Sequence, residues 1–388
     1  MQSPLNLPTP KWRDSDEMRI FEKSVQEFFT RHAPEGRMKT WRENGVVDRE
    51  MWREAGEAGL LCLSAPEQYG GMGGNFAHEA VFIDVMGKMG VDGFGASLHN
   101  AIVAPYIFEY GSEEQKQKWL PRMASGELVG AIAMTEPGAG SDLQGVKTTA
   151  KRDGNHYVIS GSKTFITNGQ TANLIIVVCK TDPTKGAAGT SLLIVETDEV
   201  DGFRRGRNLD KVGQDAQDTS ELFFDEVRVP MTNLLGTDEG QGFYQLMQQL
   251  PSERLQIGLQ GVAMMERALA VTVDYVKNRK AFGKTVWDFQ NTQFKLAEAK
   301  TETTIARVFC DWCTDLLLEG KLDAATASMA KYWVSDIQCK MVDECLQLHG
   351  GWGYMNEMAI GQMFRDARVQ RIYGGANEIM KMLIARTL

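Results

Sequence analysis

The chain has 388 residues and a formal net charge of −9, with 43% hydrophobic and 24% charged residues. This is an ordinary globular composition for two or three domains, and the acidic balance argues against non-specific binding to nucleic acid or anionic membranes. No apolar run approaches the roughly 20 residues of a membrane span. The N-terminus resembles neither a secretory leader nor an Arg-rich organellar signal, so we expect a cytoplasmic protein without a membrane span.

The first 128 residues are expected to form an N-terminal helical domain. Ser15 and Asp16 can cap the first helix, whose apolar face includes Ile20, Val25 and Phe28. Further helices are predicted over residues 48–58, 76–89, 96–110 and 113–123. A glycine-rich loop at 66–74 either borders a substrate pocket or simply connects two helices, and we favour the connection.

From residue 129 the pattern changes to short apolar, β-branched runs separated by turn residues. We expect a hairpin over 148–160, strands over 174–179 and 191–196, and a strand pair over 221–230. These runs predict a middle β-domain of barrel or sandwich type at 129–236.

Residues 237–388 return to helical periodicity. Long amphipathic helices are predicted over 242–277, 292–319 and 322–348, with a last helix over 377–388. Such helices with short connections form a bundle. Cys310 and Cys313 have Cys-x-x-Cys spacing inside one of these helices, but no second pair or nearby His completes a zinc site. We therefore expect reduced thiols and no metal.

Two stretches carry candidate ligand chemistry. The apolar run 129–134 ends at Thr135-Glu136-Pro137 and continues as Gly138-Ala-Gly-Ser-Asp142. The proline stops the strand, the glycines allow close approach of a bulky partner, and the loop presents hydroxyl and amide groups. The alternative is a plain Gly-Pro surface turn. The second stretch, 163–169, combines two hydroxyls, an aromatic ring and an Asn-Gly turn.

Together these stretches closely resemble the flavin-binding signatures of the acyl-CoA dehydrogenase family, and the resemblance runs from about Trp41 to Arg386. It implies an α+β multidomain fold with an N-terminal helical domain, a middle β-barrel-like domain and a C-terminal four-helix bundle. FAD would lie between the β-domain and the bundle. The segments Leu-Pro-Ser-Glu-Arg-Leu, Arg-Lys-Ala-Phe-Gly-Lys and Gln-Leu-His-Gly-Gly-Trp-Gly-Tyr are most similar to the long-chain branch.

The resemblance also suggests the catalytic base. Many relatives place a glutamate in a Tyr-Glu-Gly-Thr segment, where this chain has Tyr373-Gly374-Gly375 and no side chain that could act as a base. The long-chain and isovaleryl branches instead use a glutamate in a Leu-x-x-Glu-Arg-Leu segment, which matches Glu253. Taken alone, such a glutamate reads as a solvated or ion-paired side chain. Pro251 predicts a kink or helix start just before Glu253, and burial would raise the pKa of Glu253.

Cofactor and substrate positions follow from the same resemblance. The expected FAD contacts are Met134, Thr135, Gly140, Ser141, Phe165, Ile166, Thr167, Arg279, Phe282, Gln290, Gln347, Gly350, Gly351, Ala376 and Glu378. The expected substrate contacts are Ser141, Thr190, Tyr244, Arg254, Gly374 and Gly375. The main chain at Glu378 would lie near the thioester carbonyl. Phe165 and Ala376 stand where many relatives have Trp and Thr. Arg279 would reach a neighbouring subunit, or act only as a helix C-terminal cation.

The implied activity is FAD-dependent oxidation of a saturated acyl-CoA to a trans-2-enoyl-CoA in fatty acid β-oxidation, by a homotetramer that passes electrons to an electron-transferring flavoprotein. Acyl length and branching stay open. One alternative is an oxygen-reactive oxidase or monooxygenase of the same fold. The other is a non-catalytic relative that binds nucleic acid or a partner protein, against which Glu253 and the acidic charge speak. No role is assigned to residues 1–40.

Overall fold

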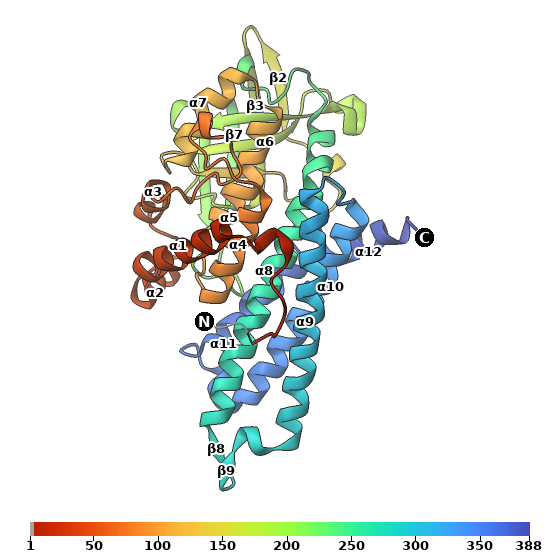
Figure 1. Ribbon diagram of the computed structural model, residues 1–388. Coiled ribbons are helices and arrows are strands. Elements are labelled where there is room, and N and C mark those ends of the chain that lie inside the picture. Colours follow the sequence, from red (N-terminus) through yellow and green to blue (C-terminus); the bar gives the residue numbers. More distant parts are fainter. Residues whose placement is uncertain (1–3) are drawn as a thin grey trace.

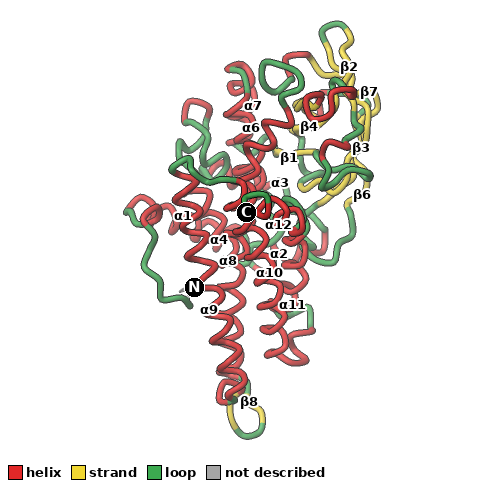
Figure 2. The backbone as a smooth tube through the Cα atoms, turned by 90° about the vertical axis from the view of Figure 1, so that its right-hand side faces the viewer, coloured by secondary structure: helices red, strands yellow, loops and turns green. Residues whose placement is uncertain are grey.

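The computed structural model describes residues 4–388, so the first three residues of the N-terminal segment discussed above lie outside it. The described chain has a helical N-terminal part, a middle β-sheet and a long C-terminal helical bundle (Figure 1). Figure 2 shows that the strands of the middle sheet gather at one end, while the long helices extend away from them. The predicted order of α, β and α regions is therefore confirmed, whereas the exact boundaries at 128/129 and 236/237 stay a prediction.

The N-terminal helices are largely those predicted, and Ser15 caps the first by accepting a hydrogen bond from the Met18 amide. The predicted helix over 96–110 is divided into two α-helical pieces by a π-helical turn at His99–Val103. Residues 35–44 form a helix that was not predicted, because only Met38 and Trp41 of this polar segment are buried. The helices are α1 Asp16–His32, α2 Glu35–Asn44, α3 Arg49–Glu57, α4 Phe76–Met89, α5 Ala96–Leu98, α6 Ala104–Tyr110 and α7 Glu113–Ala124.

The middle region is one seven-stranded sheet in the order β1-β4-β2-β3-β7-β6, with β5 paired to β4. The strand pair predicted over 221–230 is wrong, because this segment is the single strand β7. The polar residues Asp225 and Glu226, which suggested a turn between two strands, instead form a β-bulge opposite β3. Glu226 has φ of 52° in this bulge. The strands are β1 Gly130–Ala133, β2 Thr149–Asp153, β3 His156–Thr167, β4 Leu174–Lys180, β5 Thr190–Glu196, β6 Phe203–Asn208 and β7 Thr219–Pro230.

The C-terminal bundle is built on three long helices, with two short helices packed on α10. Of the predicted kink or helix start just before Glu253, the helix start is wrong, because α8 begins at Gly242 and runs through Pro251, while the kink stays a prediction. The missing Pro251 amide deprives only the Met247 carbonyl of its usual donor. A short β8–β9 hairpin (Lys280–Ala281 with Lys284–Thr285) closes the far end of the bundle. The helices are α8 Gly242–Asn278, α9 Gln290–Leu318, α10 Ala324–His349, α11 Ala359–Ala367 and α12 Asn377–Ala385.

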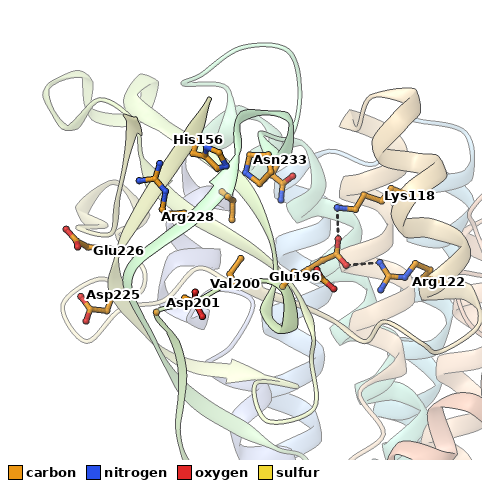
Figure 3. Close-up of a pocket in the computed structure, with 14 residues that line it drawn as sticks. Lys118, Arg122, His156, Glu196, Val200, Asp201, Asp225, Glu226, Arg228 and Asn233 are labelled. Atoms are coloured by element: carbon orange, nitrogen blue, oxygen red, sulfur yellow. Dashed lines mark hydrogen bonds and ion pairs between the residues drawn. The ribbon is translucent and has the colours of Figure 1, made fainter. Parts of the chain in front are cut away.

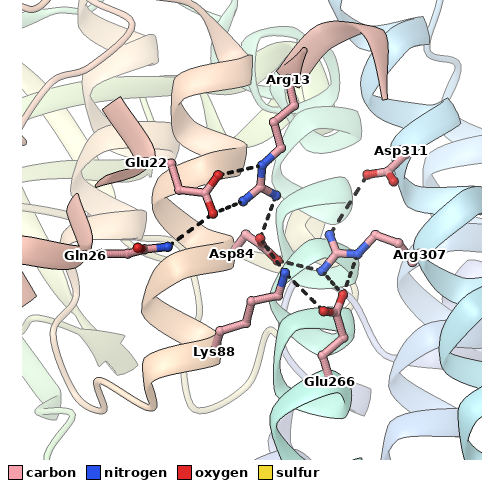
Figure 4. A network of polar contacts seen from close by, with 8 residues as sticks. All are labelled: Arg13, Glu22, Gln26, Asp84, Lys88, Glu266, Arg307 and Asp311. Atoms are coloured by element: carbon pink, nitrogen blue, oxygen red, sulfur yellow. Dashed lines mark hydrogen bonds and ion pairs between the residues drawn. The ribbon is translucent and has the colours of Figure 1, made fainter. Parts of the chain in front are cut away.

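A buried ionic network joins the N-terminal part to the bundle (Figure 4). Asp84 of α4 lies 2.6 Å from both Arg13 and Arg307, and Lys88 lies 3.1 Å from Glu266 of α8. The surrounding cations hold the pKa of the buried Asp84 carboxyl far below its usual range, against the effect of burial. Because breaking such a pair leaves an uncompensated buried charge, the network fixes α4 against α8 and α9.

The described residues contain no helix long and apolar enough to cross a membrane. Within the same part of the chain, no group of three or more His, Cys, Asp or Glu side chains is arranged to hold a metal ion. Cys310 and Cys313 are free and buried in α9. Burial raises the pKa of the Cys313 thiol to about 12, so it is protonated at neutral pH.

Candidate active site

A cavity of about 410 Å³ lies where the β-domain, the N-terminal helices and α8 meet. Its walls come from loops beside β1 and β3, from the segment at 95–102, from α8, and from the turn before α12. Eleven of the predicted site residues line it. They are Met134, Thr135, Gly140, Ser141, Phe165, Ile166, Thr167, Glu253, Arg254, Gly374 and Gly375.

Glu253 faces this cavity from α8 and is only 5% exposed. The hydroxyl of Tyr106, on α6, donates a hydrogen bond of 2.9 Å to its Oε1 atom. Burial raises the pKa of Glu253 to about 7, although the Tyr106 hydrogen bond and the Arg254 charge both act in the opposite direction. The carboxyl group is therefore partly ionised near neutral pH, as a general base requires.

Arg254 lies beside Glu253 and is 6% exposed. Its Nη1 atom donates to the Ser328 hydroxyl at 3.4 Å, while its Nε atom is buried without a hydrogen-bond partner in the described chain. Burial lowers the pKa of Arg254, but a guanidinium group stays charged at any physiological pH. The pocket therefore keeps a fixed positive charge next to a carboxyl group that titrates.

The loop at residues 135–142, which follows β1, is held by a buried ion pair between Glu136 and Lys163. Glu136 accepts hydrogen bonds from Lys163 at 2.9 Å, from the Thr148 hydroxyl at 2.6 Å and from the Lys147 amide at 2.7 Å. Lys163 also donates to the carbonyls of Val178 and Met134. These contacts hold the loop against the sheet, so that Thr135, Gly140 and Ser141 face the cavity.

The pocket side of β3 carries a strained aromatic residue. Phe165 has φ of 59°, lies at a register shift between β3 and β7, and leaves 67% of its side chain exposed. Positive φ is unusual for a bulky residue, and such strain concentrates at functional sites. In the described chain, the hydroxyls of Thr135, Ser141 and Thr167 donate to no protein acceptor. A free ring surface and free hydroxyls fit a flat cofactor with polar edges, such as a flavin.

The turn before α12 forms another part of the cavity wall. Gly374 and Gly375 have φ of 63° and 98°, which favours glycine at both positions. Their main-chain N–H groups donate to no acceptor within residues 4–388. A Cβ atom built on Gly374 would lie 2.3 Å from Cδ1 of Ile257. Ile257 therefore fills the space that a side chain at position 374 would need. The N–H groups of Gly374 and Gly375 are the two free hydrogen-bond donors of this part of the wall.

The other predicted residues do not line this pocket. Thr190 is buried and accepts a hydrogen bond from Lys180, Tyr244 is mostly exposed, and Ala376 and Glu378 lie at the start of α12 outside the cavity. None of these four residues lines the cavity, so their direct contact with FAD or substrate stays a prediction.

A second group of predicted residues lies around the far part of the bundle. Arg279, Gln347, Gly350 and Gly351 line a separate cavity of about 510 Å³. Phe282 is 95% exposed at the tip of the β8–β9 hairpin, and Gln290 is exposed at the start of α9. Figure 1 shows that this hairpin and the β-domain lie at opposite ends of the molecule. One chain therefore does not bring the two groups together.

A cavity of about 740 Å³ on the β-domain contains none of the predicted site residues (Figure 3). Glu196 accepts contacts of 2.7 Å from both Lys118 and Arg122, and the Trp119 indole donates to it at the same distance. These charged groups satisfy one another and attach α7 to the end of β5.

Three domain descriptions of one family match successive parts of the chain. "Acyl-CoA dehydrogenase, N-terminal domain" covers residues 15–127, "Acyl-CoA dehydrogenase, middle domain" covers 131–227, and "Acyl-CoA dehydrogenase, C-terminal domain" covers 240–388. The chain belongs to the acyl-CoA dehydrogenase family. It is therefore an oxidoreductase of that family, as the sequence predicted.

Individual relatives agree with this assignment. The long-chain specific acyl-CoA dehydrogenase of Mus musculus mitochondria is 50% identical over 376 residues, which is 96% of this chain and 87% of the relative. A crystal structure of acyl-CoA dehydrogenase from Geobacillus kaustophilus has a TM-score of 0.95 and 46% identity, covering 98% of this chain and 99% of the other. An acyl-CoA dehydrogenase from Bacillus anthracis, solved in complex with FAD, has a TM-score of 0.90 and 31% identity, covering 98% of this chain and 68% of the other.

Several residues of the site were not singled out from the sequence. Tyr106 lies in a very apolar segment that predicts only core packing. Gln256 and Gln260 line the pocket from α8, and Gln214 and Gln217 line it from a loop. Glutamines have no characteristic spacing that would mark them. Tyr106 carried one weak signal, since a buried tyrosine needs a partner for its hydroxyl group.

Proposed function

We propose that this enzyme removes two hydrogens from a saturated medium-chain, long-chain or branched acyl-CoA and forms the trans-2-enoyl-CoA. The observation that carries the proposal is Glu253, a buried carboxyl group with a pKa of about 7, in a pocket that is also lined by the Gly374–Gly375 turn with its two free N–H groups. Glu253 takes the proton from the α-carbon of the substrate. The thioester makes this proton acidic enough for a carboxylate to remove.

We propose that the free N–H groups of Gly374 and Gly375 donate to the thioester oxygen. Negative charge develops on this oxygen as the α-proton leaves, and fixed donors in a dry pocket stabilise it without rearrangement. Tyr106 holds the Glu253 carboxylate in place and favours its ionised form. The apolar wall formed by Ile257, Leu250 and neighbouring residues excludes water from the reacting carbons.

FAD, when bound, supplies the acceptor for the hydride from the β-carbon. We propose that Met134, Thr135, Gly140, Ser141, Phe165, Ile166 and Thr167 hold it, because they combine free hydroxyls, an exposed ring and a glycine-rich approach on one side of the pocket. The far group at Arg279, Phe282, Gln290, Gln347, Gly350 and Gly351 would reach the FAD of a neighbouring subunit. Its distance from the pocket in one chain supports this division.

The remaining parts of the proposal rest on family membership. They are electron transfer to an electron-transferring flavoprotein, a homotetrameric assembly and a role in fatty acid β-oxidation. The tetramer has a direct test, in which solution mass is measured beside flavin content for the parent and for Arg279→Gln. A fully flavin-loaded monomer, or an unchanged FAD affinity in the variant, would rule out the role of Arg279 across subunits.

The activity itself is tested by anaerobic titration of the flavin-loaded protein with straight and branched acyl-CoAs. Bleaching of the visible flavin band together with formation of a trans-2-enoyl-CoA is the expected result, and the panel identifies the substrate class. Admitting air then distinguishes the oxidase alternative, because rapid reoxidation without a protein acceptor would favour it. Absence of bleaching with every thioester would overturn the proposal.

A further inference from the structure

Helix α10 contributes no residue to the wall of the active-site pocket, yet it contacts both sides of that wall. Ser328 accepts a hydrogen bond from Arg254, the neighbour of Glu253. One turn further along, Lys331 faces the turn that carries Gly374 and Gly375. Residues three apart lie on the same face of a helix, so α10 presents both side chains toward the pocket wall.

Lys331 is an unusual residue because its side chain is fully buried. Its Nζ atom donates to the Gly375 carbonyl at 2.7 Å and to Oδ1 of Asn377 at 2.8 Å. Lysine is almost never buried unless its charge is paired or otherwise satisfied, because an ammonium group loses its hydration. Here two acceptors on either side of Ala376 replace part of that hydration.

The charges around Lys331 do not form a direct ion pair with it in the described chain. Burial and the nearby Arg254 and Arg371 lower its pKa to about 8, while Asp336 and Glu378 act in the opposite direction. The cost of burying this amine is therefore not offset by a simple salt bridge. The contacts of the amine are the Gly375 carbonyl, which belongs to the main chain of the pocket wall, and the Asn377 side chain.

The same turn has few other attachments. The N–H groups of Gly374, Gly375 and Ala376 make no hydrogen bond with residues 4–388. Both glycines have positive φ and carry no side chain, so no side-chain contact of Gly374 or Gly375 holds the turn in place. Asn377 is fixed to α10 by donating to the Tyr332 carbonyl, to Ser335 and to Asp336. Lys331 is thus the hydrogen-bond donor that ties the Gly375 peptide to the rigid bundle.

We propose that Lys331 is a positioning residue of the active site, whose ammonium group holds the 373–377 turn so that the free N–H groups of Gly374 and Gly375 face the thioester oxygen. This inference rests on the proposed function. It assigns Lys331 an action through the main chain, without contact to the substrate. A displacement of about 1 Å in such donors is enough to slow a reaction roughly 100-fold.

The test compares Lys331→Met with Lys340→Met in the flavin-loaded enzyme. Lys340 lies on the same helix but is exposed and pairs only with Glu302 in the described chain, which makes it the matched control. For Lys331→Met we expect kcat to fall by roughly 10- to 100-fold with a much smaller change in KM for the acyl-CoA. Lys340→Met should retain the parent kcat and KM.

A second readout does not depend on turnover. In the Glu253→Gln background, a bound acyl-CoA labelled with ¹³C at the thioester carbonyl reports donor strength through its infrared stretching frequency. The bound frequency should lie below the solution value, and Lys331→Met should move it back toward that value. Asn377→Ala, which removes one of the two acceptors of Lys331, should shift it in the same direction by less, and decides the question if Lys331→Met does not fold.

The outcomes separate the two proposals. If the parent enzyme does not bleach with any acyl-CoA, the proposed function fails. If the parent bleaches but the Lys331 and Asn377 variants keep the parent kcat and the parent carbonyl frequency, the positioning role of Lys331 is overturned. A uniform loss of flavin or of thermal stability, with the carbonyl frequency unchanged in the loaded fraction, would also contradict it and indicate a purely structural lysine.

Discussion

The Tyr106 hydroxyl lies 2.9 Å from Oε1 of Glu253, and the two residues are 147 positions apart in the chain. This contact joins α6 of the N-terminal domain to α8 of the bundle, beside the cavity that Glu253 lines. It supplies the carboxyl group with one directed hydrogen-bond donor, in addition to the charge of the neighbouring Arg254. The ionisation of Glu253 is therefore set by residues from two domains.

Removing the Tyr106 hydroxyl should move the pH dependence of the reaction. The hydrogen bond favours the carboxylate, so Tyr106→Phe should raise the pKa of Glu253 above its present value of about 7. Because the base must be ionised, the acid limb of the kcat/KM profile should shift to higher pH. The profile of each protein gives this shift directly, and an unchanged limb would show that the titrating group is not Glu253.

The buried charge should also cost stability at high pH. Glu253 has a pKa of about 7 in the folded protein against 4.5 as its ordinary value, so folding favours its protonated form. As pH rises from about 4.5 to 7, the parent should lose up to about 3 kcal/mol that Glu253→Gln retains. Urea unfolding of both proteins at pH 5 and pH 8.5 measures the difference, and a gap that does not grow with pH contradicts the burial argument.

The Glu136–Lys163 pair should control cofactor affinity. Lys163→Met leaves the buried Glu136 carboxylate without its cation and should release the loop that carries Thr135 and Ser141. Breaking a buried pair typically costs about 3–5 kcal/mol, shared here between folding and FAD binding. Equilibrium FAD binding to the apoprotein should weaken, whereas Lys151→Met on the exposed face of β2 should bind as the parent does.

Gly374 should resist replacement even by alanine. Its φ of 63° strains any Cβ, and that atom would meet Ile257 at 2.3 Å. Gly374→Ala should therefore destabilise the protein by about 1–3 kcal/mol and weaken acyl-CoA binding. Adding Ile257→Ala removes the clash but not the strained φ, so the double variant should bind acyl-CoA better than Gly374→Ala alone. Equal affinities would mean that Ile257 does not fill this space.

Local pattern was sufficient for much of this fold. The change from helices to strands, the hairpin at Asp153-Gly154-Asn155 and the long amphipathic helices all appear as the sequence predicted. The segment at 35–44 was missed because its apolar face is too narrow, and the 221–230 pair was wrong because a bulge and a turn leave similar local signals. A bulge and a turn cannot be distinguished from the local sequence pattern, because the pairing of 221–230 with β3 decides which of them forms.

The site shows the same limit. The loop residues from Met134 to Ser141 and Glu253 were identified because their motifs are continuous in sequence. Tyr106 and Lys331 were not, because their importance arises from contacts across 147 and 44 positions. A buried polar group reveals its role only when its partner is known. Thr190 and Tyr244 do not line the cavity, and family motifs do not fix which side of a strand or helix faces it, so their contact with substrate stays a prediction.

The most direct test of the central claim is stopped-flow flavin reduction by a reactive acyl-CoA, without oxygen, for the parent, Glu253→Gln and Glu253→Asp. We predict that Glu253→Gln still binds the acyl-CoA but that its flavin is reduced about 10²–10⁴-fold more slowly than in the parent. The rate for Glu253→Asp should lie between those of the parent and Glu253→Gln. Reduction of the Glu253→Gln flavin at the parent rate would contradict the account and show that another group removes the α-proton.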